Sequence, residues 1–161
     1  MTTLSFRKMN GLGNDFVVLD LRTHARSMAP AEIRAIADRK SGIGCDQVIA
    51  LEKSSDADVF MRIWNADGGE VGACGNAARC VAGLMSAESD GDEVRIATES
   101  GMLEAHVNDD GSVTIDMGAP RFRWDEIPLS EPFHDTRRIE LQIGPIDDPV
   151  LHSPAVVNVG N

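Results

Sequence analysis

The sequence is poor in basic side chains. Its 161 residues include 15 Lys and Arg against 26 Asp and Glu, which gives a formal net charge of −11. This acidic excess would repel a nucleic acid or an anionic membrane surface, because binding to phosphates requires clustered cations. We therefore expect neither partner, and an anionic substrate would have to be held by local hydrogen-bond donors.

Long apolar runs and a secretory signal are also absent. No stretch approaches the roughly 18 apolar residues of a membrane-spanning helix, and the first ten residues lack the apolar core of a signal peptide. Three cysteines are an odd number, which does not suit the disulfide framework of a secreted domain. These absences predict a cytoplasmic protein. Its composition, 42% apolar and 25% charged, is that of a chain that can bury a core.

Proline is scarce in the first three quarters of the chain. Six of the seven prolines lie after Gly118, whereas 13 of the 15 glycines lie at or before it. We therefore predict a domain over residues 1–118, followed at residues 119–161 by a linker and the opening strands of an incomplete second domain. The second segment, of about 43 residues, is near the size below which a chain rarely builds a core of its own.

Short apolar or alternating segments bounded by Gly, Asn and Asp predict strands. The predicted strands are Leu4–Met9, Phe16–Leu21, Gln47–Glu52, Val59–Trp64, Val94–Thr98, Met102–Val107, Ser112–Met117, Ile139–Ile143 and Ala155–Val159. Two helices are predicted, at Pro30–Lys40 and Gly75–Ala87. The second has its apolar stripe at Ala77, Cys80, Val81, Leu84 and Met85 and almost no polar face, so it should be buried. The fold class is α+β.

Cys74 lies where a glycine-rich turn meets this buried helix. A helix N-terminus leaves about four N–H groups unpaired and carries partial positive charge, so it binds carboxylates and lowers the pKa of a nearby thiol. Gly75 would allow an anionic group to approach these N–H groups closely. The alternative is that Cys74 is an inert residue in a tight turn. Taken alone, the Cys-Gly-Asn segment does not decide between them.

The other two cysteines are expected to be structural. Cys80 follows Cys74 by six helical residues, a rise of about 9 Å, which is too far for a disulfide. It also lies on the apolar stripe, which indicates a core residue, and Cys45 is interpreted in the same way. None of the four histidines has the spacing of a metal ligand, so no metal site is expected.

Amide side chains recur at glycine-rich strand ends. Asn in such places is usually a turn former, but these amides are also the better candidates for ligand contacts. They are Asn10, Asn14, Gln47, Asn65 and Asn76. The sequence Gly11-Leu12-Gly13 precedes a strand, not a helix, so a dinucleotide-binding interpretation fails.

Four segments together resemble the diaminopimelate epimerases in order and spacing. They are Lys8–Val18, Gly42–Gln47, Asn65–Gly68 and Ala73–Cys80. The resemblance extends from about Phe6 to Gly118 and resumes at Val159–Asn161. It implies a cofactor-independent amino-acid isomerase with two pseudo-symmetric domains, each a mostly antiparallel, barrel-like sheet around a central helix. The implied substrate is diaminopimelate, interconverted between its LL and meso forms for lysine and peptidoglycan synthesis.

The resemblance also implies roles for particular residues. Cys74 would be one of two catalytic cysteines, which exchange protons with opposite faces of the α-carbon. The backbone of Gly75 and Asn76 would hold the reacting carboxylate. Further substrate contacts are implied for Asn14, Gln47, Asn65 and Asn161. Ala77 replaces the family's usual Gly, and its methyl group is expected to narrow the carboxylate site slightly.

The sequence ends at Asn161, before the family's second catalytic cysteine and its ligands for the amino group. We therefore expect the 161 residues to be a fragment that is inactive alone. One alternative is a related isomerase of the proline racemase type. Another is a ligand-binding module without catalysis. A homodimer that supplies Cys74 twice is weaker, because the ligands of the amino group would still be missing.

Overall fold

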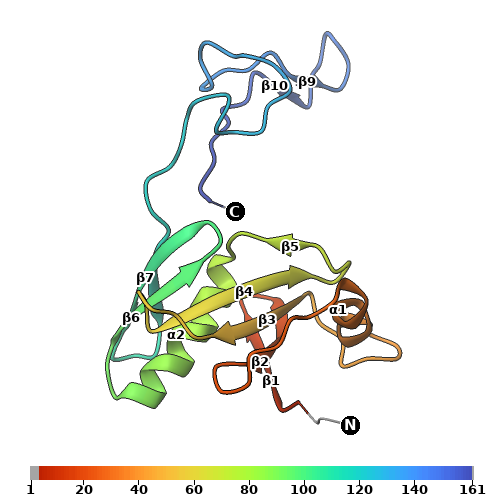
Figure 1. Cartoon of the computed structure of the whole chain (residues 1–161). Helices are drawn as coiled ribbons and strands as arrows, with labels where there is room; N and C mark the ends of the chain where they lie inside the picture. The colour runs from red at the N-terminus through yellow and green to blue at the C-terminus, as the bar shows by residue number, and fades with distance from the viewer. Residues whose placement is uncertain (1–3, 161) are drawn as a thin grey trace. The chain divides into compact units, whose positions relative to one another are not determined.

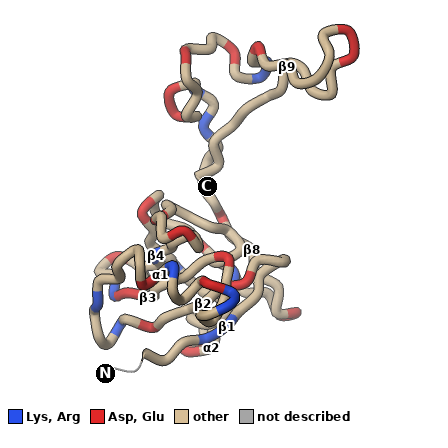
Figure 2. The backbone as a smooth tube through the Cα atoms, turned by 90° about the vertical axis from the view of Figure 1, so that its right-hand side faces the viewer, with Lys and Arg blue, Asp and Glu red and all other residues tan. Residues whose placement is uncertain are grey.

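The computed structural model describes residues 4–160 of the chain, which divide into two compact units (Figure 1). The first unit ends at Met117 and the second comprises Gly118–Gly160. Acidic stretches outnumber basic ones along the backbone, as Figure 2 shows. None of the helices within residues 4–160 has both the length and the apolar character needed to span a membrane.

The first unit is built on one eight-stranded sheet. Its strands are β1 (Phe6–Gly11), β2 (Asn14–Asp20), β3 (Gln47–Glu52), β4 (Val59–Asn65), β5 (Glu70–Val71), β6 (Glu93–Thr98), β7 (Gly101–Val107) and β8 (Val113–Asp116). Hydrogen bonds join them in the order β1-β2-β3-β4-β6-β7-β8, with β5 on β4. The pairs β2–β3 and β4–β6 are parallel and the others antiparallel. The predicted strands of this unit are present with ends shifted by at most two residues, whereas β5 was not predicted.

Strand alternation divides the apolar side chains between two cores. On β2, Phe16 and Val18 belong to the core around helix α2 (Gly75–Ser89), whereas Val17 and Leu19 belong to the core around helix α1 (Pro30–Ala37). Successive side chains of a strand point to opposite faces, so a strand covered on both faces needs a continuous apolar run. Helix α1 ends three residues before the predicted Lys40, and α2 extends two residues beyond the predicted Ala87.

The sheet curls around α2. This helix contacts β1 at one end of the strand order and β6, β7 and β8 at the other, and Figure 1 shows it against the concave side of the curled sheet. The predicted fold class, a barrel-like sheet around a central helix, is confirmed. The buried face of α2 differs from the predicted stripe, because Cys80 and Leu84 are only half-buried. It consists of Ala77, Ala78, Val81, Ala82 and Met85.

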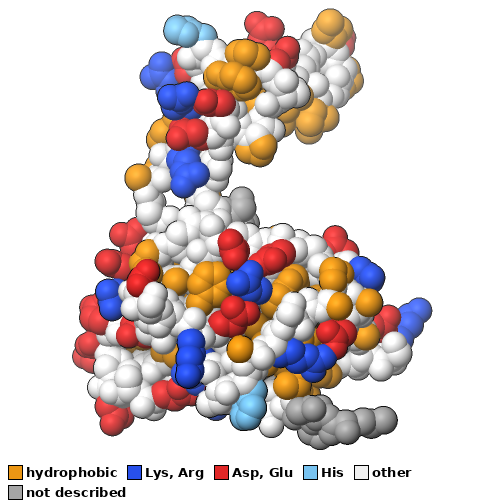
Figure 3. Space-filling view, in the orientation of Figure 1, with side chains coloured by type: hydrophobic (Ala, Val, Ile, Leu, Met, Phe, Trp, Pro, Cys, Tyr) orange, Lys and Arg blue, Asp and Glu red, His pale blue; other side chains and the backbone are white. Residues whose placement is uncertain are grey.

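The second unit is thinly packed. Its regular structure is a short antiparallel pair, β9 (Gln142–Ile143) with β10 (Leu151–His152). The predicted strand at 139–143 is therefore reduced to its last two residues, and the one at 155–159 is wrong. Only Asn158 pairs there, in an isolated bridge to Arg121, because an apolar run forms a strand only beside a partner strand. Apolar side chains are exposed on this unit (Figure 3), including Ile146 and Val150.

Candidate active site

Four elements of the first unit begin or end on the same side of the sheet, where the strands β2 and β3 start. β2 and β3 are parallel and begin at Asn14 and Gln47. β4 is antiparallel to β3 and ends at Asn65, which lies opposite Gln47 in the register. Helix α2 begins at Gly75. The sheet topology thus brings together side chains that are up to 62 positions apart in the sequence.

These ends line a cavity of about 470 Å³. Its lining residues are Asn14, Asp46, Gln47, Asn65, Cys74, Gly75, Asn76 and Met117. Six of the seven predicted site residues are among them, and the seventh, Asn161, lies outside the described residues. Asp46 and Met117 were not predicted. A larger hollow of about 1450 Å³, lined by residues 119–126 and 132–137 of the second unit, contains none of the predicted residues.

Cys74 occupies the N-cap position of α2. Its backbone is extended, with φ −151° and ψ 111°, and its carbonyl accepts the first helical hydrogen bond from Ala78 N at 2.9 Å. The thiol makes no capping hydrogen bond and is half-buried. The N–H groups of Gly75, Asn76 and Ala77 lie in the first turn, where an α-helix offers them no acceptor. A carboxylate in the cavity could accept from them while its α-carbon lay beside the sulfur.

Two residues of the first turn of α2 differ in what they expose to the cavity. Gly75 lines it, and a Cβ at this position would meet Met117 Sδ at 3.5 Å. Ala77 is fully buried in the core and does not line the cavity. The expectation that Ala77 narrows the carboxylate site is therefore wrong, because its methyl group packs into the core between α2 and the sheet.

The amide side chains of the cavity are paired with one another. Gln47 Nε2 donates to Asn65 Oδ1 at 3.0 Å, and Asn76 Nδ2 donates to Asn14 Oδ1 at 2.8 Å. Arg79, one turn along α2, donates to Asn76 Oδ1 at 2.7 Å. Sequence reasoning did not find Arg79, whose position three residues after Asn76 on a helix was the available signal.

A charged cluster fixes the starts of β2 and β3. Asp15 N donates to Asp46 Oδ2 at 2.9 Å, and Asp46 N donates to Asp15 Oδ1 at 3.0 Å. Arg39 bridges the two carboxylates at 2.6 and 2.8 Å, and Lys8 Nζ lies 2.7 Å from Asp15. Hydrogen bonds from Arg39 and Lys8 hold the pKa of Asp15 well below its usual range. Because Asn14 and Gln47 adjoin this pair, the cluster also fixes two residues of the cavity.

Cys45 and Cys80 do not line the cavity. Burial raises the pKa of both thiols, and for Cys80 the neighbouring Cys74 adds to the increase. Cys45 is buried in the core around α1, as predicted for a structural cysteine. Cys80 lies against Gly11, so it is at the contact between the β1–β2 turn and α2 and less deeply buried than predicted. Among the three cysteines, Cys74 alone reaches the cavity.

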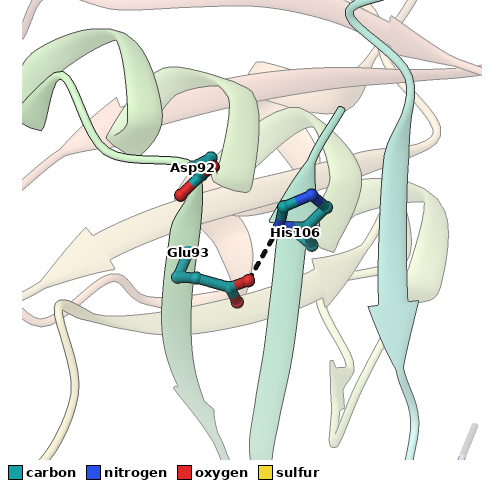
Figure 4. A group of neighbouring side chains, drawn as sticks. All are labelled: Asp92, Glu93 and His106. Carbon is teal, nitrogen blue, oxygen red and sulfur yellow. Dashed lines mark hydrogen bonds and ion pairs between the residues drawn. The ribbon is translucent and has the colours of Figure 1, made fainter. Parts of the chain in front are cut away.

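Asp92, Glu93 and His106 form a separate polar group (Figure 4). Glu93 and His106 are paired in the register of β6 and β7, and their side chains lie 2.7 Å apart. No spacing rule could find this group in the sequence, because the strand register creates it. The group lies just beyond the C-terminal end of α2, about 20 Å along the helix from Cys74. It therefore takes no part in the cavity.

The diaminopimelate epimerase family model matches residues 6–123. The chain belongs to the diaminopimelate epimerase family. The diaminopimelate epimerase of Methylobacterium sp. (strain 4-46) is 52% identical over 97% of this chain and 55% of its own length. That of Caulobacter vibrioides (strain NA1000 / CB15N) is 48% identical over 98% of this chain and 57% of its own length. This family member thus spans about half the length of the curated relatives it matches.

Solved structures resemble this diaminopimelate epimerase family member in fold. A phenazine biosynthesis protein of the PhzF family from Bacillus anthracis covers 75% of the chain with a TM-score of 0.56 and 21% identity, the match covering 42% of that structure. A hydroxyproline epimerase from Agrobacterium vitis covers 73% with a TM-score of 0.54 and 17% identity, over 42% of that structure. At such identities the likeness shows the fold alone.

Proposed function

We propose that this chain supplies one half of the active site of an epimerase that acts on diaminopimelate, with Cys74 exchanging a proton at the α-carbon. The observation that carries the proposal is that Cys74 lines the same cavity as Gly75 and Asn76, the first two residues of α2. Family membership and the names of the relatives supply the substrate and the reaction class.

The chemistry requires a base, donors for negative charge and the removal of water. An amino acid's α-hydrogen is a very weak acid, and its loss places negative charge on the carboxylate. The N–H groups of Gly75 and Asn76 would donate hydrogen bonds to that charge, and Cys74 Sγ would take the proton as a thiolate or give one as a thiol. The amide side chains of Asn14, Gln47 and Asn65 would hold the rest of the substrate.

Inversion needs a second acid or base on the opposite face of the α-carbon. One group removes a proton and the other delivers one, so the net proton count is unchanged. Cys74 is the one cysteine that reaches the cavity. We propose that the second group is a cysteine from outside this set of cavity residues, as the family resemblance implies. Residues 1–161 alone should then be inactive. No cofactor enters this scheme, and the pathway would be the cytoplasmic synthesis of lysine and peptidoglycan.

The test measures the entry of deuterium at the α-carbon of LL-diaminopimelate in heavy water by the full-length protein, using mass spectrometry. Cys74→Ala should abolish inversion, whereas Cys80→Ser should retain both exchange and inversion. L-Proline should not exchange, which separates this function from a proline racemase.

An unchanged rate in the Cys74→Ala variant would contradict the role of this cysteine. Binding of diaminopimelate in calorimetry without deuterium entry in the unaltered protein would replace catalysis with a ligand-binding function. This alternative has one observation in its favour, namely that a single thiol lines the cavity.

A further inference from the structure

We propose that Arg79 sets the direction of a chain of amide hydrogen bonds, so that Asn14 presents its N–H₂ group to the substrate. The chain runs from Arg79 Nη1 to Asn76 Oδ1, at 2.7 Å, and from Asn76 Nδ2 to Asn14 Oδ1, at 2.8 Å. We call these two hydrogen bonds the amide relay. The proposal rests on the proposed function, because it assigns Asn14 a substrate contact.

The chemistry of Arg79 fixes the orientation of both amides. A guanidinium group has donors and no acceptor, so Asn76 must turn its oxygen toward it. The Asn76 nitrogen then faces Asn14, which must accept with its own oxygen. Asn14 Nδ2 is left facing away from this bond, and within residues 4–160 no acceptor is bonded to it. Because Asn14 lines the cavity, this nitrogen is available to a bound carboxylate.

Without Arg79 the relay would have no preferred direction. Each amide could rotate by half a turn about its last bond and exchange donor for acceptor with little change in shape. Half-turned amides would place the Asn14 oxygen toward the substrate, where it would repel a carboxylate. Arg79 is thus a positioning residue, which acts on the substrate through Asn76 and Asn14. The Gln47–Asn65 bond lies outside the relay and serves as an internal reference.

The kinetic test uses the full-length protein with LL-diaminopimelate and compares Arg79→Met, Arg79→Lys, Asn14→Ala and the double variant Arg79→Met/Asn14→Ala. Arg79→Met should raise KM by about 10- to 100-fold, the range for losing a hydrogen bond to a charged group. The effect on kcat should be smaller, because the contact is made before and during proton transfer alike. Arg79→Lys keeps a donor and should recover most of the lost affinity.

The double variant distinguishes the relay from a structural role. If Arg79 acts through Asn14, adding Arg79→Met to Asn14→Ala should leave KM nearly unchanged, since the two effects are not additive. An equal rise in KM in both backgrounds would overturn the proposal. A KM of the Arg79→Lys variant as high as that of Arg79→Met would also overturn it.

A spectroscopic measurement tests the relay without turnover. In nitrogen-15 NMR spectra of the ligand-free protein, Arg79→Met should shift the side-chain N–H₂ signals of Asn14 and Asn76 and leave those of Gln47 in place. Unmoved Asn14 signals in a folded variant would refute the relay. Absence of diaminopimelate turnover in the unaltered protein would instead refute the proposed function, and the spectra would still decide whether Arg79 orients the amides.

Discussion

Gly11, at the end of β1, lies close to helix α2. A Cβ added to Gly11 would lie 2.8 Å from the backbone oxygen of Asn76 and 3.3 Å from Cys80 Sγ. Gly11 is not among the glycines with positive φ, so alanine is compatible with its backbone conformation. The Gly11→Ala substitution therefore tests the close approach alone.

The expected magnitude follows from these distances. Ordinary van der Waals contact begins at 3.4 Å, so the turn and the helix must separate by about 0.6 Å. Overpacking of this kind costs about 1–3 kcal/mol, and the neighbouring atom here is helix backbone, which cannot rotate away. We expect the free energy of unfolding to fall by about 2 kcal/mol, which moves the urea midpoint by about 1 M. Activity should fall by about 10- to 100-fold, because the same separation stretches the Asn14–Asn76 hydrogen bond.

The assay is urea unfolding followed by circular dichroism, together with epimerase kinetics of the full-length protein. Gly83→Ala is the matched control, since it adds a Cβ to the same helix with no atom of any other element within 4 Å. It should raise the free energy of unfolding by about 0.5–1 kcal/mol and leave turnover unchanged. Wild-type stability and turnover in Gly11→Ala would refute the reasoning, as would an equal loss in both variants.

Two further predictions concern titratable groups. Asp15 has a lower pKa in the folded state than in the unfolded state. Its carboxylate therefore stabilises the fold above the unfolded-state pKa, near 4, and this stabilisation is lost as the pH falls through the folded-state pKa. The gap in urea midpoint between the wild type and Asp15→Asn should therefore narrow from pH 7 toward pH 2, and a constant gap would contradict the role of the ionised carboxylate. In native alkylation with iodoacetamide, followed by peptide mass spectrometry, Cys74 should react before Cys45 and Cys80, because burial raises the pKa of the latter two. Faster labelling of Cys80 than of Cys74 would contradict the assignment of Cys74 to the cavity.

The strands of the first unit could be predicted because the pattern of apolar residues in each strand follows which of its faces are buried. The runs at β2 and β3 are apolar on consecutive residues, as a sheet covered on both faces requires. Helix α2 was predicted from its lack of a polar face, but its buried side was displaced, because small Ala78 and Ala82 allow closer packing than Cys80 or Leu84. Hydrophobicity alone would predict deeper burial for Cys80 and Leu84 than for Ala78 and Ala82.

The parts that were missed depend on neighbours that are distant in the sequence. β5 has two residues and exists through its pairing with β4. Met117 reaches the cavity because β8 returns beside α2, which no local pattern encodes. The segment at 155–159 has the apolar composition of a strand, but no described strand lies beside it beyond the single bridge at Asn158. Pairing partners, and not propensity, decided these cases.

Helix α2 links the stability of the first unit to its proposed chemistry. Its buried alanines hold it against the sheet, Cys74 is its N-cap residue, and its first turn supplies the unpaired N–H groups beside that cysteine. A substitution that shifts the helix must therefore move the thiol relative to Asn14 and Gln47, which are fixed separately by the Asp15–Asp46 cluster. The two supports differ in kind, since one is apolar packing and the other is charge. Variants of the core should thus alter substrate affinity even where no side chain of the cavity has changed.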